Sequence, residues 1–241
     1  MKAHILFLTF LLLYNTSFSQ NLSGLQLLDK AIEYHDPNGN WDSFNGELFV
    51  AMETPNNPNR DSKIIINLPE QYFYVKSNRD SITIEYELIK NECFIKFNDR
   101  IDVTDEEIKT HRLTCERATM YKNYYTYLYG LPMKLKDNGT IIHDKVERRT
   151  FKGKEYLILK VTYDKAVGSD IWYFYFNPKT YAMEVYQFYR MDENGNQKED
   201  TGEYILLSEE KTINNIIMPK KRAWYYNKDD KYLGTDILKK E

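Results

Sequence analysis

Residues 171–176 read Ile-Trp-Tyr-Phe-Tyr-Phe, six consecutive apolar or aromatic residues. An antiparallel strand with one face in water alternates apolar with polar residues, and this segment does not. Both of its faces must therefore be covered by other parts of the protein. A large curved antiparallel sheet with helices against its concave face would provide that cover and leave an apolar cavity between the layers. A core that the helices fill completely is the alternative.

Period-two alternation predicts further strands on both sides of this segment. Proline residues and Asn/Asp clusters, such as those in 177–180 and 227–230, mark the turns between them. We expect about ten or eleven strands in all. The segments with this pattern are 47–53, 64–66, 72–74, 82–88, 156–161, 181–190, 204–207, 222–226 and 232–238.

Helical signals appear in two places, before the first strands and in the middle of the chain. Ser23 is a candidate N-cap for a helix that must end at Asp36-Pro37. Thr104 followed by Glu107 is a capping-box pattern and predicts a short helix. A longer helix with an aromatic face is predicted up to Gly130 and Pro132, and its spaced residues are Met120, Tyr124, Tyr127, Leu128 and Leu131.

The first residues have the three-part pattern of a secretory signal peptide: Lys2, an apolar run over 5–13, and small residues at Ser17 and Ser19. The run is too short for a membrane anchor, which needs about 20 apolar residues. We expect cleavage after Ser19 and one domain over 20–241. Because no cysteine lies near the cut, we expect a soluble periplasmic protein without a lipid anchor.

Charge and cysteine content restrict the function classes. The net charge of −3, with acids and lysines interspersed, disfavours nucleic-acid binding. Cys93 and Cys115 are the two cysteines, and export favours a disulfide between them over two buried thiols. The histidines show no metal-ligand spacing, so we expect no metal site and no cofactor.

No motif of a known catalytic class is present in the sequence. The polar cluster Tyr34-His35-Asp36 is the one candidate, because His35 beside Asp36 could be an oriented base. A helix end and turn explain the same residues without catalysis. We therefore expect a protein that is not an enzyme.

Four segments, 31–41, 124–135, 176–181 and 224–230, resemble an uncharacterised family of exported bacterial envelope proteins. That family is similar in fold to LolA and LolB, the periplasmic carrier and outer-membrane acceptor of lipoproteins. The resemblance implies a mainly β (α+β) fold, an incomplete β-barrel closed by a few helices, with an apolar cavity for acyl chains. No motif of the carrier itself is found, so no functional residue transfers by position.

The leading hypothesis is a periplasmic, non-enzymatic binding protein or carrier for an apolar small molecule or an acylated protein, with transient contact with a membrane or a membrane-bound partner. An envelope interaction or assembly module with a filled core is the alternative. The residues expected to line the cavity are Tyr124, Tyr127, Leu128, Leu131, Trp172, Phe174, Phe176 and Trp224.

Overall fold

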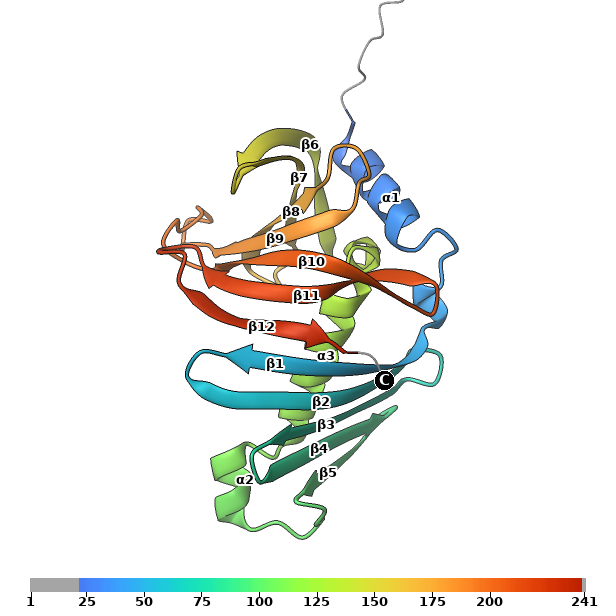
Figure 1. Ribbon diagram of the computed structural model, residues 1–241, viewed down its shortest axis with the longest axis vertical. Helices are drawn as coiled ribbons and strands as arrows, with labels where there is room; N and C mark the ends of the chain where they lie inside the picture. The colour runs from blue at the N-terminus through green and yellow to red at the C-terminus, as the bar shows by residue number, and fades with distance from the viewer. Residues whose placement is uncertain (1–21, 240–241) are drawn as a thin grey trace, which may run out of the picture.

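The computed structural model describes residues 22–239, and all twelve strands in this part belong to one open antiparallel sheet (Figure 1). The predicted signal peptide lies outside the described residues. From one edge of the sheet to the other, the strands are β5 (Glu92–Phe97), β4 (Ile82–Ile89), β3 (Tyr72–Arg79), β2 (Asn57–Asn67), β1 (Asn45–Thr54), β12 (Tyr232–Leu238), β11 (Ile216–Tyr226), β10 (Glu203–Ile213), β9 (Met183–Arg190), β8 (Asp170–Phe176), β7 (Lys154–Tyr163) and β6 (Thr140–Phe151).

The ten strands expected from the sequence, nine from alternation and β8 from its unbroken apolar run, are present, and the two strands that the sequence did not reveal are the edges, β5 and β6. β6 was not recognised in the sequence because most of its residues are charged or polar: it contains His143, Asp144, Lys145 and the run 147–149. Charged residues on an edge strand discourage pairing with another chain. They also remove the apolar alternation by which a strand is found in a sequence.

Both predicted helix N-caps are confirmed, and each is part of a capping box. Ser23 caps α1 (Gly24–His35) together with Gln26, and Thr104 caps α2 (Asp105–His111) together with Glu107. On α1, Leu27, Leu28 and Ala31 are fully buried, whereas Leu25 is 52% exposed. Two short 3₁₀ helices, η1 (Trp41–Ser43) and η2 (Met133–Lys136), follow α1 and α3.

The long helix α3 (Cys115–Gly130) lies across one face of the sheet, behind the strands in Figure 1. Its Tyr125 ring stacks on Phe73 of β3 with 6.4 Å between centroids, and its Tyr127 ring meets Trp172 of β8 at 5.9 Å. The helix thus bridges the two halves of the sheet. Its buried side differs from the predicted stripe, because Met120 is 42% exposed while Tyr125 and Tyr129 are buried.

The two apolar faces of β8 are covered in different ways. On the inner face, Phe174 and Phe176 belong to the main core together with residues of α1 and α3. On the outer face, Tyr175 packs with Phe151 and Tyr156 in a second small cluster. Both faces of β8 are therefore covered, as its apolar sequence predicts: helices pack on one face and neighbouring aromatic side chains on the other.

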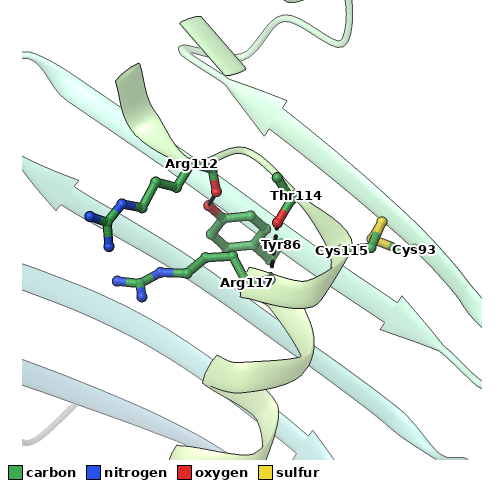
Figure 2. The surroundings of a disulfide bond; sticks show 6 residues. All are labelled: Tyr86, Cys93, Arg112, Thr114, Cys115 and Arg117. Atoms are coloured by element: carbon green, nitrogen blue, oxygen red, sulfur yellow. Dashed lines mark hydrogen bonds between the residues drawn. A yellow bond between two sulfur atoms is a disulfide. The ribbon is translucent and has the colours of Figure 1, made fainter. Parts of the chain in front are cut away.

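The predicted disulfide is confirmed: Cys93 of β5 is bonded to Cys115, the first residue of α3 (Figure 2). Cys115 follows the N-cap Thr114, whose side chain accepts a hydrogen bond from the Arg117 amide at 3.2 Å. The covalent link therefore fixes the start of α3 to one edge of the sheet.

Replacing both cysteines by serine is expected to lower the free energy of unfolding by roughly 3 kcal/mol, the chain-entropy value for a loop of this length. Equilibrium urea unfolding of the oxidised wild type and the double variant measures the difference. Equal unfolding midpoints with equal slopes would contradict a structural role for the bond.

Candidate ligand-binding groove

A groove of about 480 Å³ lies beside the C-terminal half of α3, between this helix and the segment that joins β7 to β8. The helix contributes Tyr124, Thr126 and Tyr127. The opposite side comes from the strand ends and the connecting segment, with Tyr163, Val167 and Trp172. The volume falls in the range of about 300–1,000 Å³ that is common for small-molecule sites.

One part of the groove wall is aromatic and uncharged, and it consists of Tyr124, Tyr127, Tyr163 and Trp172. The hydroxyl groups of Tyr127 and Tyr163 share a hydrogen bond. Burial raises the pKa of Tyr163 to about 12, and burial together with the neighbouring Tyr163 raises the pKa of Tyr127 well above its usual range. Both phenols are therefore neutral at physiological pH, and the ring of Trp172 continues this surface.

Polar and charged residues also line the groove. Lys134 and Asp137 form an ion pair, and Asn123, Ser169 and Asp170 complete this polar part, in which Asn123, Asp137 and Ser169 are exposed. Val167 is the exception, an apolar side chain that is 58% exposed. An aromatic wall beside charged residues suits a ligand with one apolar and one polar end.

Three of the eight residues expected to line a cavity, Tyr124, Tyr127 and Trp172, do line the groove. Leu128, Leu131, Phe174 and Phe176 instead lie in the packed core, each no more than 4% exposed. Trp224 stacks on Tyr124 at 6.4 Å. Tyr163 and Val167 could not be found by sequence reasoning, because the end of a strand and an irregular segment have no periodicity.

The centre of the concave face is occupied by charged groups. Arg222, 1% exposed, donates hydrogen bonds to the carbonyl oxygens of Leu128 at 3.1 Å and Pro219 at 3.3 Å, and its guanidinium lies 4.1 Å from the Tyr129 ring centroid. Asp236, opposite Arg222 on β12, accepts a hydrogen bond from the Trp224 indole at 3.2 Å. Burial raises the pKa of Asp236. An acyl chain placed here would separate buried polar partners, which is costly.

His35 and Asp36 have structural contacts that occupy their polar atoms. The His35 Nε2 atom accepts a hydrogen bond from the Met183 amide at 2.9 Å, so Nδ1 carries the proton and donates to the Ile217 carbonyl at 2.7 Å. Asp36 accepts hydrogen bonds from the amides of Asn40 and Trp41, both at 2.8 Å. The cluster therefore ends α1 and fastens it to β9 and β11.

A family model described as "Family of unknown function (DUF6503)" matches residues 2–241. The chain belongs to this family. The match agrees with the resemblance to an uncharacterised family noted in the sequence. No curated protein matches the chain.

Two solved structures are similar to this DUF6503 protein in architecture. A LolA superfamily protein from Nitrosomonas europaea is 12% identical, with a TM-score of 0.49, and the match covers 91% of this chain and 95% of that one. A DUF1329 family protein from Desulfovibrio piger is 10% identical, with a TM-score of 0.43, over 87% of this chain and 89% of the other.

Two features are absent from residues 22–239 of the DUF6503 chain. No helix in this part is long and apolar enough to cross a membrane. The same residues contain no group of three or more His, Cys, Asp or Glu side chains placed to hold a metal ion.

The buried His35 predicts a defined pH dependence of stability. Burial lowers the pKa of His35 below the unfolded value of about 6.5. Below pH 6.5 the unfolded chain therefore binds a proton at this histidine, whereas the folded chain does not bind it until the pH reaches its lower pKa. The stability that His35 contributes is therefore present at pH 7.5 and is lost as the pH falls below about 6.5, by up to about 1.4 kcal/mol per pH unit until the folded pKa is reached.

Urea unfolding of wild type and His35→Gln at pH 7.5, 6.5 and 5.5 measures this contribution. The stability difference between the two proteins should shrink as the pH falls, and other titrating groups cancel because both proteins contain them. A difference that stays constant or grows toward pH 5.5 would be inconsistent with a neutral, buried histidine.

Proposed function

We propose that the groove beside α3 binds an acyl chain or a similar apolar group, and that the protein is a non-enzymatic binding protein or carrier of the bacterial cell envelope. The observation that supports this most is the uncharged aromatic wall of Tyr124, Tyr127, Tyr163 and Trp172 around a space of about 480 Å³. The ligand lies at the side of α3, because the core residues and the Arg222 contacts fill the centre of the sheet.

The hydrophobic effect provides the affinity. Each methylene removed from water contributes roughly 0.8 kcal/mol, so eight methylenes contribute about 6 kcal/mol before the entropic cost of binding. The polar end of the ligand would remain at the rim with Lys134 and Asp137. A groove open to solvent at its rim is suited to taking up and releasing such a ligand.

Placement in the envelope is supported by the signal-peptide pattern, with cleavage after Ser19 and the mature domain over 20–241. The alternative, an interaction module without a ligand, is supported by the filled centre of the sheet. The two proposals differ in one respect that is measurable, namely whether the groove accepts an apolar probe.

Thr126→Trp tests the groove. Thr126 is half-buried and lines the groove, so an indole at this position fills the space with little effect on the core. We expect wild type to bind a fluorescent fatty acid with a stoichiometry of one, displaceable by phospholipid, and Thr126→Trp to bind at least tenfold more weakly with an unchanged melting temperature.

Thr119→Trp is the matched control, because it is the same substitution two turns earlier on the same helix, at an exposed position outside the groove. It should bind the probe like wild type. Failure of wild type to bind any fatty-acid or phospholipid probe would refute the carrier proposal and favour the interaction module.

A further inference from the structure

Two arginine side chains, Arg60 of β2 and Arg79 of β3, are neighbours on the concave face of the sheet. β2 and β3 pair in register up to Asp61 and Asn78, and the next residue outward on each strand is an arginine. Alternation places both arginines on the face of the buried Ile64, which is the face that α3 crosses (Figure 1). The Cβ atoms of such cross-strand neighbours are roughly 5 Å apart. The two guanidinium groups are therefore close enough to bind one ligand.

Neither arginine is neutralised by the fold. Within residues 22–239, neither forms an ion pair, and the Arg60 guanidinium donates one hydrogen bond, to the Tyr125 hydroxyl at 3.4 Å. The Nε atoms of both arginines are buried without a hydrogen-bond partner in the same part of the chain. Like charges opposite each other on neighbouring strands repel, and a buried donor without an acceptor costs free energy. An anion bound between the two groups would remove both penalties.

The acidic residues nearest to the two arginines have other partners or lie in a turn. Asp61 is on the opposite face of β2 and pairs with Lys239 at 2.9 Å. Asp99, which follows β5, pairs with Lys76 on that same opposite face at 3.6 Å. Asp80 lies in the exposed turn between β3 and β4. Within the described residues, none of these three carboxylates forms an ion pair with either arginine.

The other charges near this part of the concave face balance one another. Asp236 of β12 lies two strands from Arg60 and is paired in register with Arg222 of β11. The first turn of α3 adds one acid and one base, Glu116 and Arg117. Each of these two pairs has no net charge, so the charges of Arg60 and its neighbour on β3 remain. A local positive charge in a protein of net charge −3 favours an anionic ligand.

We propose that Arg60 and Arg79 form a binding site for an oxyanion of the phosphate type, held between their guanidinium groups. A guanidinium group presents parallel N–H donors in one plane, which match two oxygen atoms of a phosphate. Both side chains are half-buried, so a ligand can reach them from solvent. Neither arginine lines the groove beside α3, and the proposal is therefore independent of the ligand proposed there.

Isothermal titration calorimetry of the mature chain with inorganic phosphate and with a soluble short-chain phosphatidic acid tests the site. The titrations are made in about 0.15 M sodium chloride, where charges more than roughly 8 Å apart are screened. Wild type should bind both probes. Arg79→Gln should bind roughly tenfold more weakly, as expected for the loss of charge-assisted hydrogen bonds. Arg79→Lys should also bind more weakly, because it keeps the charge and loses the planar donors.

Arg79→Gln is the first variant to make, because in the described residues this side chain has no ion pair and its buried Nε has no partner on which folding depends. Arg60→Gln should show the same loss of affinity. Arg148→Gln on β6 is the control, with the same change in net charge at an exposed residue paired with Glu155 at 2.9 Å. Its affinity should equal that of wild type.

The two probes distinguish the sources of the phosphate group. Equal affinities would assign the site to phosphate groups in general, and tighter binding of the phosphatidic acid would assign it to a lipid head group; both results support the oxyanion site. The proposal is overturned if wild type binds neither probe, if folded Arg79→Gln or Arg79→Lys binds as tightly as wild type, or if the β6 control loses as much affinity as Arg79→Gln.

Discussion

The packing of α3 into the concave face of the open sheet is the constraint on which the rest of the structure depends. A sheet of twelve strands with a largely apolar inner face is unstable in water unless that face is covered. α3 covers it from β4 to β8, with its first residue bonded to the edge strand through Cys93 and its tyrosines stacked on aromatic residues of the strands. Because this helix fills the centre, the groove lies at its side.

Polar contacts determine how α3 sits on the sheet. Apolar surfaces attract without direction, so they would permit the helix to rotate or slide. The hydrogen bond from Arg222 to the Leu128 carbonyl is directional, and it holds the last turns of α3 at one height above β11. This placement brings Tyr124 and Tyr127 to the edge of the groove while Tyr125 and Tyr129 remain buried. Burying Arg222 and Asp236 costs desolvation energy, and the hydrogen bonds of Arg222 to Leu128 and Pro219 and the attraction between the two charges reduce this cost.

The features of this fold that local chemistry determines could be predicted from the sequence. Ser23 and Thr104 cap their helices through short-range hydrogen bonds, alternation identified nine inner strands and the apolar run 171–176 the tenth, and export with two cysteines indicated the disulfide. The rotation of α3 could not be predicted, because apolar and tyrosine residues occur all around it and tertiary contacts decide which are buried. For the same reason Leu128 was expected in a cavity and lies in the core, whereas Tyr163 and Val167 border the groove without any local signal.

In the proposed binding mode, an apolar ligand lies at the side of α3 and not beneath it. Photocrosslinking with a diazirine-bearing fatty acid, followed by peptide mass spectrometry, locates the bound chain directly. Adducts are expected on the peptides that contain Tyr124, Tyr127, Tyr163 and Trp172, and unlabelled fatty acid should compete for them. Adducts concentrated on core residues of the inner face, such as Ile64 and Ile205, would contradict this binding mode, because they would place the ligand between helix and sheet.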